Sequence, residues 1–221
     1  MSLIVNLVTN GMMVEEIVDE YPGVEAEDIQ QALRHAAWAT EDTVLKADSR
    51  AESDGEEEQL VAELELLGIR YLSRRTPDRA QRVRQPDALL ADLVRQPSAR
   101  VRNAVIAVLL SHPGYADALP AALERLCPAD RRTLRLFYTA AVLLQQEHAE
   151  RLQSFVTGRR LPDRFAADLG LPPAASPRER LLALGRRHRQ QTQTVVNWVG
   201  TYENVVRRLL RSWELEAQWN R

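Results

Sequence analysis

The sequence predicts an all-α protein, with a small helix-turn-helix module followed by an irregular helical bundle. Apolar residues recur at spacings of three and four through most of the 221 residues, which is the spacing of one helix face. Asn-Gly, Pro-Gly and Ser-Pro pairs punctuate these segments where helices begin or end. The composition, with 45% hydrophobic and 27% charged residues, is that of a globular chain with enough apolar material for a core.

Charge divides the chain into two parts of opposite sign. Residues 1–58 hold 15 acidic and three basic residues, a net charge of −12, whereas residues 59–221 hold 16 acidic and 26 basic residues, a net charge of +10. The acidic run over 48–58 is mixed with Ser and Gly, which is typical of a solvated linker. We therefore expect a module over 1–47, a linker over 48–58 and a helical interaction domain over 59–221. Parts of opposite charge either have different partners or attract each other.

Three short helices are predicted in the first module. Residues 3–10 form the first, which stops at Gly11 because glycine readily adopts the left-handed conformation after a helix end. The second helix begins near Val14, carries apolar residues at i, i+3, i+4 and i+7, and ends at Pro22. The third runs from about Glu25 to Trp38, so the last two helices form a helix-turn-helix pattern.

The sequence LIVNLVTNGMMVEEIVDEYP over 3–22 and its continuation EDIQQALRHAA over 27–37 resemble the DUF433 family. The resemblance extends over residues 2–47, and the chain begins where the usual N-terminal extended segment of that family ends. Members are small homeodomain-like proteins that are often encoded as antitoxins beside PIN-like ribonuclease toxins. The resemblance therefore implies DNA binding and a nuclease partner.

The third helix would enter the major groove if the module binds DNA. Its candidate base readers are Gln30, Gln31 and Arg34, because glutamine pairs bidentately with adenine and arginine with guanine. Three carboxylates in its first turn oppose phosphate binding. A module that docks on the second domain or on a basic protein partner is therefore the favoured hypothesis, and base-specific DNA contact is the alternative.

The second domain begins with a helix predicted over 59–72, with an apolar stripe from Leu60 to Tyr71. An arginine-rich stretch follows. Its candidate basic patch is Arg74, Arg75, Arg79, Arg82 and Arg84. A nucleic-acid or acidic-partner patch is one interpretation. A solvated connector is favoured, because no aromatic residue is interleaved to stack on bases.

Residues 86–96 and 98–111 predict a helical hairpin split by Pro97, with Ser98 as the cap of its second helix. The stretch over 92–109 resembles a single HEAT-type repeat, and no second copy follows, so we expect a bundle and not a solenoid. The core positions of the second helix would be Val101, Ala104, Val105, Val108 and Leu109.

Four further helices complete the domain. We expect them over 115–126 with a distortion at Pro120, over 128–155, from Ser176 with a capping box, and from about residue 194 to the C-terminus. The apolar stripe of the last helix is Trp198, Tyr202, Val205, Leu209 and Trp213. A core stripe is favoured over a groove for a partner.

Residues that could carry chemistry are few. Cys127 has no histidine near it in the sequence, so a buried structural thiol is expected. His148 lies on an apolar stripe, and its neighbour Glu147 faces elsewhere, which favours a core or rim histidine over a metal ligand. His188 stands among arginines that disfavour a bound cation. We expect no catalytic site, no metal and no cofactor.

These observations favour a cytoplasmic, non-enzymatic protein of antitoxin-like or regulatory type. It would bind a partner protein, with a PIN-like nuclease toxin as the candidate, and bind DNA weakly through the module. A second copy of the chain is a further candidate partner, and no segment is apolar enough to cross a membrane. The alternative is a nucleic-acid-binding accessory protein that uses the arginine-rich surface of the second domain.

Overall fold

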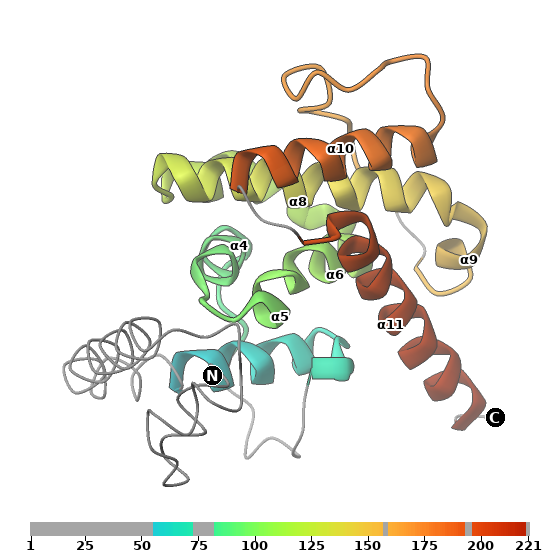
Figure 1. Cartoon of the computed structure of the whole chain (residues 1–221). Coiled ribbons are helices and arrows are strands. Elements are labelled where there is room, and N and C mark those ends of the chain that lie inside the picture. The colour runs from blue at the N-terminus through green and yellow to red at the C-terminus, as the bar shows by residue number, and fades with distance from the viewer. Residues whose placement is uncertain (1–54, 73–81, 157–158, 193–195, 220–221) are drawn as a thin grey trace, which may run out of the picture. The chain divides into compact units, whose positions relative to one another are not determined.

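A computed structural model describes residues 55–72, 82–156, 159–192 and 196–219 (Figure 1). The helices expected over 1–47 lie outside the described residues and stay predictions. Within the described ranges the regular structure is helical and contains no strand, which confirms the all-α class. None of the helices in these ranges is long and apolar enough to cross a membrane.

The described residues from 56 onward form one unit. It begins with a helix over 55–66 and continues, in chain order, with η1 (Arg70–Leu72), α4 (Pro86–Arg95), α5 (Ala99–Arg102), α6 (Ala104–Ser111), η2 (Pro113–Ala118), α7 (Leu119–Glu124), α8 (Pro128–Glu147), α9 (Ala149–Gln153), α10 (Pro177–Thr192) and α11 (Trp198–Trp219).

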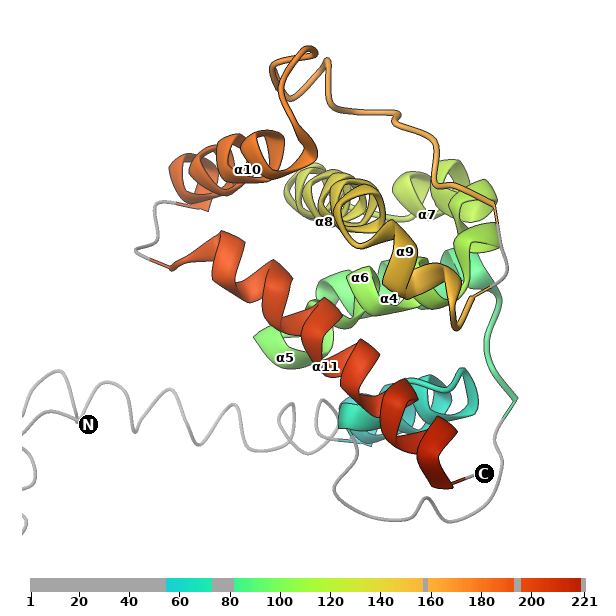
Figure 2. The ribbon, with the colours of Figure 1, turned by 90° about the vertical axis from the view of Figure 1, so that its right-hand side faces the viewer.

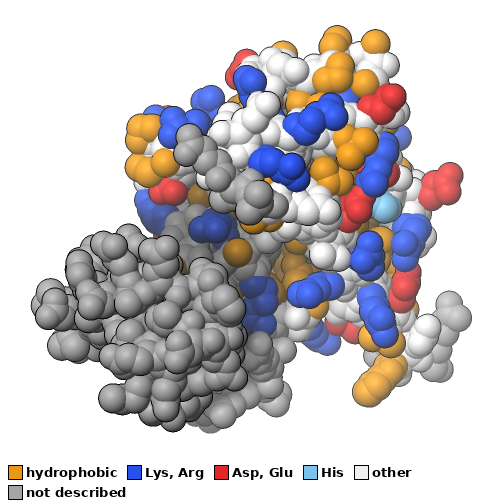
Figure 3. Space-filling view, in the orientation of Figure 1, with side chains coloured by type: hydrophobic (Ala, Val, Ile, Leu, Met, Phe, Trp, Pro, Cys, Tyr) orange, Lys and Arg blue, Asp and Glu red, His pale blue; other side chains and the backbone are white. Residues whose placement is uncertain are grey.

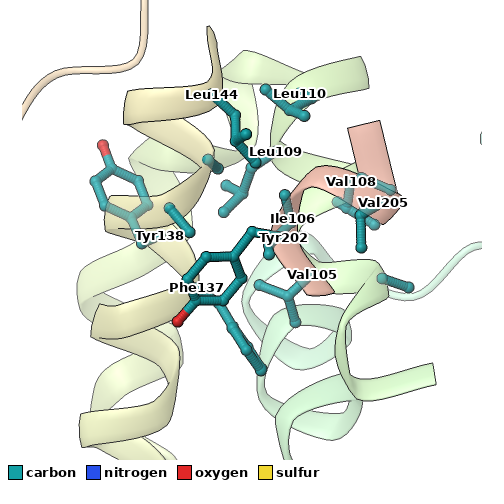
Figure 4. Packing of buried hydrophobic residues seen from close by; sticks show 14 of the residues in the cluster. Val105, Ile106, Val108, Leu109, Leu110, Phe137, Tyr138, Leu144, Tyr202 and Val205 are labelled. Atoms are coloured by element: carbon teal, nitrogen blue, oxygen red, sulfur yellow. The ribbon is translucent and has the colours of Figure 1, made fainter. Parts of the chain in front are cut away.

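Helix α6 is the centre of the unit. Every residue from Ala104 to Leu110 is buried, as expected of a helix that is hydrophobic on all sides. It packs against α8 on one side and α11 on another, and α10 runs along α8 in the opposite direction (Figures 1 and 2). In Figure 4 Phe137 from α8 lies beside Tyr202 from α11, while Leu144 from α8 lies near Leu109 and Val205 from α11 lies near Val108. The core stripe predicted for residues 101–109 is thereby confirmed.

The helix predicted over 59–72 ends early, at residue 66, and this prediction was wrong in its boundary. Gly68 adopts a left-handed φ of 78°, which ends the helix. The amide of Gly68 donates to the Glu65 carbonyl at 2.9 Å, and that of Ile69 donates to the Leu64 carbonyl at 2.8 Å. These two bonds form a Schellman motif that turns the chain into η1.

Two other predicted helices are interrupted. The helix expected over 128–155 stops at Glu147, because His148 leaves the helical conformation with φ −106° and ψ 24° before α9 begins. The second helix of the hairpin divides into α5 and α6 at Asn103. The segment from 115 starts as the 3-10 helix η2, and Pro120 stands in the first turn of α7, where its missing N–H is tolerated.

Of the two helix caps predicted from the sequence, the one at Ser176 is present in the structure and the one at Ser98 is not. Ser176 and Glu179 form the predicted capping box: the Glu179 carboxylate accepts from the Ser176 amide at 2.8 Å, and the Glu179 amide donates to the Ser176 hydroxyl at 3.3 Å. Ser98 occupies the predicted cap position, but its side chain makes no capping hydrogen bond. The last helix begins at Trp198, later than predicted, and the Asn197 side chain accepts from the Gly200 amide.

Arg84 fastens the helix over 55–66 to α4. Its guanidinium binds the Glu63 carboxylate at 2.8 Å and the Asp92 carboxylate at 2.6 Å, and its backbone amide also donates to Glu63. Glu63 is only 3% exposed, so this pair is largely withdrawn from solvent. Arg84 therefore stabilises the fold of this unit. The basic-patch interpretation needs its guanidinium to be available to a ligand, but the guanidinium is already paired with two carboxylates.

Candidate functional site

A groove opens where four parts of the unit meet: the end of the first helix, the end of α6, the end of α9 and the second half of α11. Its volume is 260 Å³. Its walls are formed by Leu67, Ser111, His112, Phe155, Val156 and Trp213, with Glu216 at one side.

The apolar wall of the groove is an aromatic pair. The ring centroids of Phe155 and Trp213 are 5.6 Å apart, with 37° between the ring planes. Phe155 lies two positions after the last residue of α9 and is 37% exposed, whereas Trp213 is partly buried against the core. The remainder of the predicted α11 stripe, from Trp198 to Leu209, is buried as expected. Trp213 thus ends the core stripe and begins an exposed apolar surface.

The polar wall of the groove is already organised by the fold. The His112 Nε2 lies 2.9 Å from the Leu67 carbonyl, and because a carbonyl only accepts, Nε2 carries the proton. The His112 ring also packs on Tyr115 at 5.5 Å between centroids. The Ser111 hydroxyl is buried and has no hydrogen-bond partner among the residues that the structure describes.

A smaller hollow of 130 Å³ shares Val156 with the groove. It is bordered by Leu110, Gln145, Gln153 and Arg160. Both volumes lie below the roughly 300–1,000 Å³ that is usual for small-molecule sites. Single side chains of a partner fit spaces of this size better than a substrate does.

A buried aromatic cluster joins α10 to α11, away from these hollows. The His188 Nδ1 lies 2.5 Å from the Tyr202 hydroxyl, and its ring stacks on Trp198 with 3.5 Å between centroids. His188 is 1% exposed. Burial, with the positive charge of Arg102 as a second cause, lowers the pKa of His188 to about 4. The cluster is neutral at physiological pH and holds the two helices together.

The structure describes few of the residues that the sequence suggested for function. Arg82 is exposed, and Arg84 belongs to the pair described above. The other suggested residues lie outside the described ranges: Gln30, Gln31, Arg34, Arg74, Arg75 and Arg79.

The prediction of a buried thiol at Cys127 was wrong. Cys127 is exposed, and it occupies the extended N-cap position before Pro128. Its thiol donates to the Asp130 carboxylate at 3.1 Å. His148 is half-buried at the helix break, and burial lowers its pKa. Within the described ranges, no three His, Cys, Asp or Glu side chains lie together in a way that could hold a metal ion.

Sequence reasoning did not identify the groove itself. The sequence pattern assigns Trp213 to the core stripe and makes Phe155 the end of a continuous helix over 128–155, so it does not predict that the two side chains meet. The available signal was His148, a helix-weakening residue at the end of a long apolar pattern, since the break there brings Phe155 to Trp213.

Comparison with known proteins extends to the N-terminal segment alone. Residues 1–36 match the model of a family described as a protein of unknown function, DUF433, in agreement with the resemblance of the sequence. No curated protein and no solved structure matches the chain.

Proposed function

We propose that this chain is a regulatory binding protein of the antitoxin type, in which the helical unit holds a partner protein. The observation that carries the proposal is the Phe155–Trp213 pair that lines the groove, in which Phe155 is exposed and Trp213 is partly buried. Aromatic residues are enriched in protein interfaces and supply most of their strongly contributing contacts. The proposed role is binding and not catalysis.

Neighbouring side chains support a protein partner. Leu66 and Leu215 are 49% and 47% exposed, and each lies within two residues of a groove residue. An apolar segment of a partner could bury Leu66 together with the aromatic pair, whereas Leu215, two positions after Trp213, faces another side of α11.

The nature of the partner follows from the N-terminal segment. DUF433-like antitoxins are encoded beside PIN-like ribonucleases, so the product of an adjacent nuclease gene is the partner to test first. In this proposal the DUF433-like segment adds weak DNA binding through Gln30, Gln31 and Arg34.

The test is to co-express the full chain with the adjacent nuclease and to measure the affinity of the purified complex. Phe155→Ala is expected to weaken the complex at least tenfold, because an interface aromatic commonly contributes about 2 kcal/mol. Leu182→Ala on α10 is the matched control, since Leu182 is 41% exposed and does not line the groove. Equal affinities of the Phe155→Ala and Leu182→Ala proteins would show that the groove is not the binding site.

A further inference from the structure

Every carboxylate of α11 forms an ion pair with an arginine from another element. Each pair joins α11 to a neighbouring part of the unit and neutralises one negative charge of this helix. The pairs are Glu203 with Arg178, Glu214 with Arg151 and Glu216 with Arg70. The remaining charges of this helix are therefore positive.

Six exposed arginines of α10 and α11 form what we name the basic face: Arg186, Arg187, Arg189, Arg207, Arg208 and Arg211. None of them has a carboxylate partner among the residues that the structure describes. Arg207 contacts only the amide oxygen of Asn204, at 3.1 Å. Figure 3 shows arginine side chains along both helices on the face turned to the viewer.

The two helices hold these arginines in fixed positions. His188 lies between Arg187 and Arg189 in the sequence, and it is fixed by its contacts with Trp198 and Tyr202 on α11. On α11 the three arginines fall within an arc of about 100°, on the side away from the buried stripe. The basic face is thus carried by rigid helices and not by loops.

Helix α5 adds positive charge beside these helices. Burial raises the pKa of Tyr71, and the positive charges of Arg208 and Arg100 act on the same phenol in the opposite direction. The positive charge of Arg102 acts on His188 of α10, so Arg100 lies near Tyr71, on which Arg208 of α11 also acts, and Arg102 lies near α10. Repulsion among these cations is relieved when an anion approaches them.

The side chains around the arginines favour nucleic acid over an acidic protein. Gln190, Gln191 and Asn204 are exposed between them, and amide side chains together with arginine are typical ligands of phosphate and sugar groups. Leu182 is exposed on the same side of α10 as Arg186 and Arg189, but one leucine is less than the apolar centre expected of an interface with an acidic protein. Trp198 and Tyr202 are buried, so they offer no stacking platform for single-stranded bases.

We propose that the basic face binds the phosphate backbone of duplex nucleic acid without reading its sequence. This surface differs from the groove, so the two proposals stand or fall separately.

The experiment measures binding of the full chain to a fluorescent duplex DNA of random sequence by anisotropy, between about 50 and 200 mM salt. The triple variant Arg207→Gln, Arg208→Gln, Arg211→Gln should bind more weakly. Its slope of log affinity against log salt should be shallower by up to about 3, because each lost phosphate contact removes about 0.9. Circular dichroism and melting temperature verify that the variant is folded.

A matched control loses the same net charge elsewhere. Arg95, Arg125 and Arg159 are exposed and already paired with carboxylates that do not belong to α11, and changing all three to Gln removes three positive charges outside the basic face. This control should retain a slope close to that of the unmodified chain. Equal losses in the two triple variants would overturn the proposal in favour of a general charge effect.

Two further probes decide the kind of ligand. Single-stranded DNA of equal length should bind more weakly than the duplex, and tighter binding of the single strand would overturn the assignment to duplex. A polyglutamate peptide should not displace the duplex at equal charge concentration. Binding of this peptide without binding of duplex would overturn the proposal and assign the surface to an acidic protein.

Discussion

Protonation of His188 should destabilise the helical unit at mildly acidic pH. The folded protein holds this imidazole neutral, with a pKa of about 4, whereas the unfolded chain has the ordinary value of about 6.5. Between these values the unfolded chain binds more protons, so the free energy of unfolding falls as the pH falls. The stability that depends on a neutral His188 is fully present above pH 6.5. It decreases as the pH falls from 6.5 to the folded pKa of about 4.

The magnitude follows from the two pKa values. A difference of one pKa unit corresponds to about 1.4 kcal/mol. Lowering the pH from 6.5 to about 4 therefore removes about 3 kcal/mol from the free energy of unfolding through His188. Stabilities of single domains are commonly about 5–15 kcal/mol, which makes this loss measurable. Burial is the main cause, because the ring is enclosed by Trp198, Tyr202 and Phe137.

The assay is chemical denaturation of the full chain at several pH values, followed by the circular dichroism of its helices. His188→Gln removes the titrating group and keeps a polar partner for the Tyr202 hydroxyl, so the slope of stability between pH 6.5 and 5 should largely disappear. His148→Gln is the matched control and should retain most of the slope, since His148 is only half-buried. An unchanged slope in the His188→Gln protein would refute the reasoning.

Two stability predictions concern helix ends. Gly68→Ala should lower the free energy of unfolding by about 1–2 kcal/mol because φ is 78° there, whereas Gly114→Ala, with open space around it and no such φ, should be nearly neutral in the same melts. Ser176→Ala should cost about 1 kcal/mol by removing the hydroxyl of the capping box. The backbone amide and the hydroxyl of Ser176 both lower the pKa of Glu179, so losing the hydroxyl should raise this pKa part of the way toward its ordinary value. A Ser176→Ala protein with the melting temperature and Glu179 titration of the parent would contradict the capping role.

Helix existence could be predicted from the sequence because the apolar spacing reports it directly. The stripe from Trp198 to Leu209 and the capping box at Ser176 are local patterns, and both are present in the structure. Helix interruptions are less visible. At His148 and Asn103 the intrinsic helix propensity is weak, and tertiary packing overrides it. The apolar spacing continues through both positions, so it does not reveal the breaks.

The groove and the basic face depend on contacts between distant segments. Phe155 contacts Trp213, which is 58 positions later in the sequence. The apolar spacing within one segment of the chain cannot predict a contact between two distant segments. Ion pairs act in the same way for charge. The sequence counts 26 basic residues after position 58, but only the pairing of Glu203, Glu214 and Glu216 reveals which arginines of α11 keep an uncompensated charge.

DNA binding by the N-terminal segment can be separated from binding by the basic face, because base contacts and phosphate contacts respond differently to sequence. Arg34→Ala should weaken binding to the protein's own promoter by several-fold more than binding to a random duplex, since a bidentate base contact is worth about 1–3 kcal/mol. The triple variant of α11 should weaken both by the same factor, because phosphate contacts carry no sequence information. Promoter binding that shows no sequence preference at low and moderate salt would remove the base-reading role from Arg34. The segment would then be a docking module, and its three first-turn carboxylates would favour a basic surface of a protein partner.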